Sequence, residues 1–297
     1  MEKKTWPYYG IQVLGWVLQL LPYTWLLALG GFFGGLAAQF SGRHRERGVA
    51  NARMALGIDE GEARKLIKEM YKNFGKNALE LLYSNRLRDD SEYLRKIIEF
   101  APSEEFLAWR AKGSGGMFVS AHYGNWEWML MRIAAENMPV GTIVKSQPQP
   151  WLNALLNKGR RRNGGEVFTR TKSGKEVLAA IRRMKQGMYL GLLCDQAGGP
   201  DGFASEFFGQ VTSTMSGPGI IAVRSGIPVF PVFIYRRPGG GHRLIVGNLL
   251  PETKDPVVMT QNMQKVIEEQ VRKKPDEWLW LQRRWQAPVS VKEGDEE

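Results

Sequence analysis

The sequence predicts an α/β fold in which a central mixed, largely parallel sheet is flanked by helices, with a hydrophobic, membrane-anchoring helical segment before it. Two observations lead to this prediction. After residue 43, short apolar runs alternate with stretches of helical periodicity, an alternation that builds sheets covered by helices. Residues 5–41 contain no Asp, Glu, Lys or Arg. We therefore divide the chain into an anchor (1–42), a main domain (43–290) and an acidic tail (291–297).

The uncharged N-terminal run exceeds the ~20 residues that a helix needs to span a bilayer. Pro22 and a cluster of glycines interrupt it, so two shorter helices or a hairpin within one leaflet remain open. A pair of core helices in a soluble protein is a further alternative. The run is too long and too aromatic for a cleaved signal peptide. We interpret it as a retained anchor, and the arginines that follow it favour a cytoplasmic main domain: Arg43, Arg45 and Arg47.

The composition is that of a globular protein, with 43% apolar and 24% charged residues. Cys194 is the single cysteine, which excludes an internal disulfide and a cysteine-rich metal site. Because no histidines and carboxylates cluster at ligand spacing, we expect neither a metal nor a cofactor.

The net charge of +11 is concentrated between residues 150 and 185, where ten basic residues accompany two acidic ones. This basic patch suits phosphate groups, anionic lipid headgroups or an acidic protein partner. We do not expect nucleic acid as a partner, because no recognised nucleic-acid module accompanies the charge.

The elements of the main domain follow from periodicity and capping signals. Asp59 and Glu62 form a capping-box pattern before a long amphipathic helix, with Ala78 and Leu81 expected on its apolar face. A second capping box is predicted at Ser173 and Glu176, and segment 198–214 is predicted to be a long loop. The predicted strands are 116–120, 141–144, 188–194, 228–235 and 243–246; the predicted helices are 126–136, 150–162, one from 218, and 257–273.

His122 and Glu127 are the leading candidates for catalysis. His122 follows the predicted strand 116–120, and strand ends are where α/β folds present reactive groups. Imidazole is suited to proton transfer near neutral pH, and a carboxylate can fix its tautomer. Residues five apart on a regular helix point about 140° apart, so a turn at Gly124 and Asn125 must separate the pair. The alternative is a histidine that makes one structural hydrogen bond.

Asp195 is the second carboxylate of interest because it directly follows the predicted strand 188–194. Since parallel strands end at the same edge of a sheet, Asp195 and His122 are expected on one edge. Taken alone, an aspartate at a strand exit is more often a turn or helix-cap residue.

Several sequence blocks follow one another in order between Arg45 and Trp285. They are 47–51, the motif from His122 to Glu127, Asn153 with the arginines at 160–162, Asp195 with Gln196, 207–209, 227–231 and 278–285. In this order the chain resembles the lipid A biosynthesis acyltransferase family, of the lauroyl or myristoyl acyltransferase type, within the lysophospholipid acyltransferase-like superfamily.

The resemblance implies transfer of a fatty acyl group from acyl carrier protein to a hydroxyl of a lipid A precursor or similar glycolipid, at the cytoplasmic face of the bacterial inner membrane. It implies that His122 is the general base, that Glu127 orients it, and that the substrate hydroxyl replaces an enzyme nucleophile. Arg160, with Arg162 as second choice, matches the family's substrate-binding arginine. Asp195 matches an acidic position that serves substrate binding or support of the site.

Two other functions remain open. The first is a glycerophospholipid or phosphatidylinositol mannoside acyltransferase that uses acyl-CoA. The second is a membrane-tethered binding protein without catalysis, in which His122 is structural. A thiol mechanism through Cys194 is disfavoured, because this residue ends an apolar strand without any sign of an activated thiolate.

Overall fold

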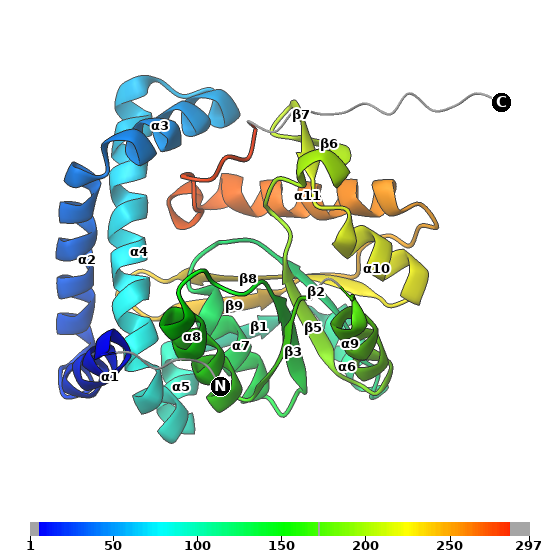
Figure 1. Ribbon diagram of the computed structural model, residues 1–297, viewed down its shortest axis with the longest axis horizontal. Coiled ribbons are helices and arrows are strands. Elements are labelled where there is room, and N and C mark those ends of the chain that lie inside the picture. The colour runs from blue at the N-terminus through cyan, green and yellow to red at the C-terminus, as the bar shows by residue number, and fades with distance from the viewer. Residues whose placement is uncertain (1–5, 172, 286–297) are drawn as a thin grey trace.

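The computed structural model is built around a seven-stranded sheet (Figure 1) and describes residues 6–171 and 173–285, so the predicted tail at 291–297 lies outside it. The strand order is β1-β9-β8-β2-β5-β3-β4. Strands β8 to β4 are parallel, whereas β9 joins β8 antiparallel and β1 runs parallel to β9. The predicted mixed, largely parallel sheet is confirmed. The strands are β1 (Ile98–Pro102), β2 (Gly116–Ser120), β3 (Val140–Val144), β4 (Gly165–Thr169), β5 (Tyr189–Leu193), β8 (Val229–Arg236) and β9 (His242–Val246), and β6 (Phe203–Phe207) pairs with β7 (Gln210–Thr214) in a separate hairpin.

Helices make up most of the remaining structure. They are α1 (Trp6–Leu18), α2 (Tyr23–Phe40), α3 (Gly42–Leu56), α4 (Glu60–Asp89), α5 (Ser91–Ile97), α6 (Glu104–Arg110), α7 (Trp126–Ala134), α8 (Pro150–Arg162), α9 (Lys175–Lys185), α10 (Gly217–Ser225) and α11 (Pro256–Lys273), with short 3₁₀ helices η1 (Gly199–Asp201) and η2 (Pro275–Glu277).

Both faces of the sheet are covered because successive side chains of a strand point to opposite sides. In β2, Met117 packs into one apolar core with Met263 of α11, and Phe118 packs into a second core with Trp128 of α7. Figure 1 shows α11 on the opposite side of the strands from α5 and α7. The end of β2, which precedes His122, is therefore held between two packed layers.

Most predicted elements are confirmed, and the differences have local causes. The capping box at Asp59 is present, since its carboxylate accepts from the Glu62 backbone N–H at 2.8 Å. The capping box predicted at Ser173 is wrong, because Gly174 takes the N-cap position in a left-handed conformation and Glu176 accepts from the Thr171 hydroxyl instead. The predicted loop 198–214 contains the β6–β7 hairpin.

The uncharged N-terminal run folds as two helices, α1 and α2, and Pro22 precedes the second. Proline lacks the N–H that would continue a helix, so the interruption lies where the sequence predicts it. Within the described ranges, no single helix is long and apolar enough to span a bilayer, although α2 and α3 meet the criterion together with a bend of 96° between them. The anchor over residues 1–42 stays a prediction.

Helices α2 and α4 stand side by side in Figure 1 and touch through glycines. A Cβ atom on Gly34 would lie 2.2 Å from the Tyr71 carbonyl oxygen, and one on Gly75 would lie 2.2 Å from the Gly30 carbonyl oxygen. These distances leave no room for a side chain. The backbones therefore approach as closely as in small-residue helix packing.

The other side of α2 presents large apolar side chains to the surroundings. Trp25, Phe32 and Phe40 are 66%, 65% and 81% exposed, and Trp6 and Trp16 of α1 are 83% and 65% exposed. We call these five residues the α1–α2 apolar face. An apolar surface of this kind marks an interaction site with protein or membrane.

Replacement of Gly34 by Ala is expected to destabilise the protein by about 1–3 kcal/mol, because the added methyl group overpacks the contact with α4. Gly35→Ala is the matched control, since a Cβ there meets only the Lys72 side chain, at 3.8 Å or more, and alanine favours helix. Denaturant unfolding of both variants in one detergent measures the difference. Equal unfolding free energies for the two variants would contradict the close packing.

Candidate active site

His122 and Asp195 meet at the carboxyl ends of two neighbouring strands. β2 and β5 pair in parallel with Ser120 opposite Leu193, so the chain leaves both strands at the same edge. The Asp195 carboxylate accepts hydrogen bonds from His122 Nδ1 at 2.8 Å and from the His122 backbone N–H at 3.0 Å. The predicted proximity of these two residues is confirmed.

Asp195 is fully buried and accepts two further hydrogen bonds, from Trp278 Nε1 and Gln282 Nε2, both at 2.8 Å. Burial raises the pKa of Asp195, but the neighbouring His122 and the hydrogen bonds lower it more, to about 2. The carboxylate is therefore ionised throughout the physiological pH range. Since no part of its surface is exposed, the carboxylate contacts only the protein groups around it, and its role in substrate binding stays a prediction.

The tautomer of His122 follows from this partner. An ionised carboxylate only accepts hydrogen bonds, so Nδ1 carries the proton and Nε2 keeps a lone pair. The His122 side chain is 19% exposed, and its ring packs edge-on against Trp126 with centroids 5.2 Å apart. Burial lowers the pKa of His122, but the Asp195 carboxylate and the charge of Glu127 outweigh it, and the net pKa is raised. Nε2 is thus a basic nitrogen of defined orientation.

Glu127 does not hold the imidazole, contrary to the role predicted from the sequence. It lies in the first turn of α7 and forms a two-point ion pair with Arg160, whose Nε donates at 3.0 Å. Among the described residues, the hydrogen-bond partner of the His122 ring is Asp195. The reason is geometric, because the turn at Gly124 and Asn125 starts a new helix and directs Glu127 toward α8. The charge of Glu127 contributes to raising the pKa of His122.

Arg160 and Arg162, the two predicted substrate-binding arginines, both line a small pocket of about 70 Å³ between α1, α4 and α8. Arg160 is half-buried and paired with Glu127, whereas Arg162 is exposed. Glu127 forms part of the same wall. The pocket also has apolar walls, which are Ile11, Leu81, Leu82, Leu155 and Leu156.

The residues that close the site from the C-terminal side are not among the predicted site residues. Trp278 and Gln282 donate to Asp195, and Trp278 also packs against Phe207, with ring centroids 5.7 Å apart. Trp278, Gln282 and Phe207 lie in the sequence blocks that carry the family resemblance. Their place in these blocks was the sequence signal that could have identified them. Cys194 is fully buried, and burial raises the pKa of its thiol strongly, which agrees with the rejection of a thiol mechanism.

The sequence profile of the family described as bacterial lipid A biosynthesis acyltransferase matches residues 3–287. The chain belongs to this family. It is therefore an acyltransferase, and both the family and the enzyme class predicted from the sequence are confirmed.

Several relatives match nearly the whole chain, and two of them come from Escherichia coli K12. The lipid A biosynthesis lauroyltransferase of Escherichia coli K12 is 25% identical over 286 residues, covering 94% of this chain and 90% of the relative. The lipid A biosynthesis palmitoleoyltransferase of the same organism is 24% identical, covering 95% and 91%. The phosphatidylinositol mannoside acyltransferase of Mycolicibacterium smegmatis is 24% identical over 60% of this chain and 59% of the relative.

Replacement of Asp195 by Asn is expected to lower the pKa of His122, because it removes the largest influence that raises this pKa. In the wild-type protein the raised pKa of His122 means that protonation of this residue contributes to the stability of the fold. The contribution is fully present below about pH 6.5, the unfolded-state pKa, and is lost as the pH rises through the folded-state pKa. NMR titration of the histidine Cε1–H signals, with His122→Gln for assignment, measures the shift.

Glu127→Gln is the matched control for this titration. It is expected to lower the pKa of His122 by less, since Glu127 makes no hydrogen bond to the ring among the described residues. An unchanged titration midpoint in Asp195→Asn would show that Asp195 does not control the imidazole.

Proposed function

We propose that this enzyme is a membrane-anchored O-acyltransferase that moves a fatty acyl group from an acyl carrier protein thioester to a hydroxyl of a lipid A precursor or similar glycolipid. The observation that carries the proposal is the Asp195–His122 pair, in which the buried carboxylate holds Nδ1 and leaves the lone pair of Nε2 free on a partly exposed ring. Membership of the acyltransferase family supplies the reaction class.

The chemistry requires one general base. His122 Nε2 accepts the proton of the acceptor hydroxyl as that oxygen attacks the thioester carbonyl, and a tetrahedral oxyanion forms. The intermediate collapses with cleavage of the carbon–sulfur bond. The imidazolium returns the proton to the departing sulfur, so that the products are an ester and a free thiol. Asp195 holds the ring and stabilises its protonated form, as the acid does in a serine-protease triad.

Glu127 and Arg160 have a second role in this proposal. The Glu127 charge makes His122 more basic, and Arg160 fixes the carboxylate in place. In this proposal Glu127 belongs to the catalytic machinery through its charge, whereas Asp195 is the residue that orients the imidazole. Arg160 lines the pocket while its Nη1 donates to Asn157 Oδ1 at 3.2 Å, and exposed Arg162 offers a cation for the anionic groups of a glycolipid. The apolar walls of the pocket suit an acyl chain.

The basic patch supports a carrier protein as donor. Helix α9 exposes Lys175, Arg182 and Lys185 on the same face as Leu178, which is 57% exposed. Figure 1 places α9 at the opposite end of the molecule from α2, so this face is available to a partner away from the α1–α2 apolar face. Cations around an apolar side chain complement an acidic protein surface.

The α1–α2 apolar face supports attachment to a membrane. Its tryptophans suit the interface between lipid and water, and the arginines that follow α2 favour the cytoplasmic side of a bacterial inner membrane. A retained anchor would keep the enzyme where a glycolipid acceptor is dissolved.

The similarity to a phosphatidylinositol mannoside acyltransferase over 181 residues makes phosphatidylinositol mannosides a second class of candidate acceptor. Purified enzyme is given the same acyl chain on acyl carrier protein or on CoA, with a lipid A precursor, a phosphatidylinositol mannoside or a lysophospholipid as acceptor. Faster turnover with the carrier protein and the lipid A precursor is expected. Turnover confined to acyl-CoA with either other acceptor would overturn the proposed donor and acceptor.

Replacement of His122 by Ala is expected to lower kcat by about 10²–10⁴-fold, the usual contribution of a general base. His44→Ala is the control, because His44 is exposed on α3 and its loss is expected to leave kcat unchanged. Product is quantified by mass spectrometry, and unfolding of both variants is compared with wild type. A folded His122→Ala protein with undiminished turnover would rule out His122 as the base and favour a binding protein or another mechanism.

A further inference from the structure

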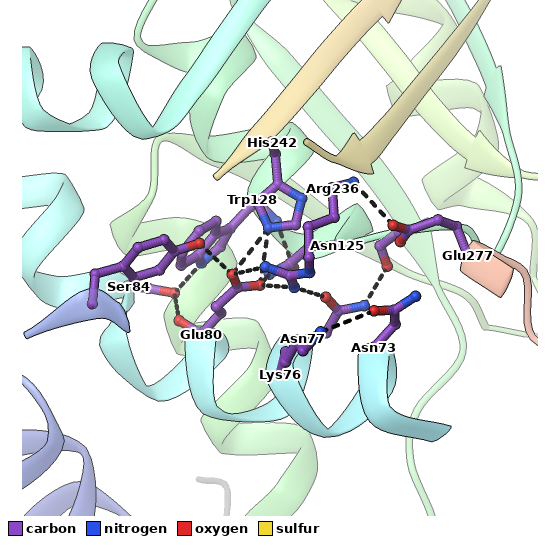
Figure 2. Close-up of polar contacts among 12 residues, drawn as sticks. Asn73, Lys76, Asn77, Glu80, Ser84, Asn125, Trp128, Arg236, His242 and Glu277 are labelled. Carbon is purple, nitrogen blue, oxygen red and sulfur yellow. Dashed lines mark hydrogen bonds and ion pairs between the residues drawn. The ribbon is translucent and has the colours of Figure 1, made fainter. Parts of the chain in front are cut away.

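A buried charged cluster lies behind the active-site turn and takes no part in the mechanism described above (Figure 2). Its centre is Glu80 of α4, which is fully buried. The Glu80 carboxylate forms a two-point ion pair with Arg236 of β8, at 2.6 and 2.9 Å, and accepts from His242 Nε2 of β9 at 3.0 Å. The Tyr23 hydroxyl of α2 donates to it as well.

The cluster reaches the active-site motif through Asn125. The Asn125 side-chain amide donates to Glu80 Oε2 at 2.9 Å, while its carbonyl oxygen caps α7 by accepting from the Trp128 backbone N–H at 3.3 Å. Asn125 is 3% exposed, so each end of its amide has one fixed function. Figure 2 shows Asn125 among the residues that surround Glu80.

The same cluster holds the preceding residue of the turn. Asn77, one helical turn before Glu80, accepts from Arg236 at 2.8 Å and donates to the Gly124 carbonyl oxygen at 2.8 Å. Gly124 has a positive φ of 56°, and a Cβ atom there would lie 1.8 Å from the Ile234 carbonyl oxygen. The turn is thus pressed against β8 on one side and bonded to α4 on the other.

Glu80 remains charged in this position. Burial raises the pKa of Glu80, but His242 and Arg236 lower it more strongly. Since every group that faces the carboxylate donates a hydrogen bond, a neutral amide in its place would direct an N–H at another donor. The site is therefore specific for a carboxylate.

We propose that Glu80 is a positioning residue for acyl transfer: through Asn125, its buried carboxylate fixes the turn that sets Glu127 and Trp126 relative to the imidazole of His122. The proposal rests on the catalytic role of His122. Trp126 packs against His122, and the charge of Glu127 raises the pKa of His122. A shift of the α7 N-terminus therefore changes both the packing and the electrostatic environment of the imidazole. Glu80 itself does not touch the substrate.

The test compares Asn125→Ser and Glu80→Gln with wild type. Serine keeps the helix cap through its hydroxyl but loses the donor to Glu80, which separates capping from positioning. Both variants are expected to lower kcat by about 10–100-fold, because small misplacements of catalytic groups cost that much. KM for the acyl carrier protein thioester is expected to change by less than about twofold. The double variant is expected to be no slower than the worse single variant, since both act through one contact.

Glu136→Gln is the matched control. Glu136 follows the far end of α7 and pairs with buried Arg132, so this variant removes a carboxylate from a buried arginine without touching the turn. Its kcat is expected to equal that of wild type even if its unfolding midpoint falls. His122→Ala, measured in parallel, identifies a failure of the proposed catalytic mechanism.

If Glu80→Gln does not fold, Asn125→Ser decides the question alone. Wild-type kcat in a folded Asn125→Ser protein, with His122→Ala inactive, would overturn the positioning role and leave the catalytic mechanism standing. A kcat loss in Glu136→Gln as large as that in Asn125→Ser would also overturn it, because the effect would then follow general destabilisation.

Discussion

The arrangement of the site depends on one buried carboxylate. Asp195 cannot be left unpaired in the interior, since an isolated buried charge is strongly unfavourable. Its four hydrogen bonds come from the backbone and ring of His122, from Trp278 and from Gln282. The end of β2, the end of β5 and the C-terminal segment are therefore joined at a single point. The hydrogen bonds that orient His122, the proposed base, are therefore also among those that hold the fold together.

The fold was predictable because its signals are local. Helix α8 spans Pro150–Arg162, as periodicity and the proline at its start predict, and β2 and β5 lie within one residue of their expected ends. The edge strand β1 and strand β4 were missed. Each has only five residues and partial burial, so neither produces a distinct alternation of apolar and polar side chains.

The site was predicted in part, and the error has a clear origin. Sequence proximity favoured Glu127 as the partner of His122, but a parallel sheet brings the ends of distant strands together, and Asp195 is the partner. Ala78, expected on the buried face of α4, is exposed while Glu80 is fully buried. The signal was present as a polar stripe, with Asn73, Asn77, Glu80 and Ser84 recurring at spacings of four, three and four. From the sequence alone, a polar stripe on a helix predicts a solvent-exposed face. Only the tertiary structure shows that other elements cover this one.

The glycine contact between α2 and α4 has a consequence for the geometry of the reaction. Helix α4 also carries Asn77 and Glu80, which bond to the turn after His122, so close packing and hydrogen bonds connect the apolar helices to the turn beside the proposed base. In the membrane-bound enzyme that we propose, contact of the α1–α2 apolar face with lipid would hold His122 Nε2 at a fixed height above the bilayer. Only an acceptor hydroxyl that projects from the membrane to that height would then be acylated. The distance between the apolar helices and the base would thereby select the acceptor position.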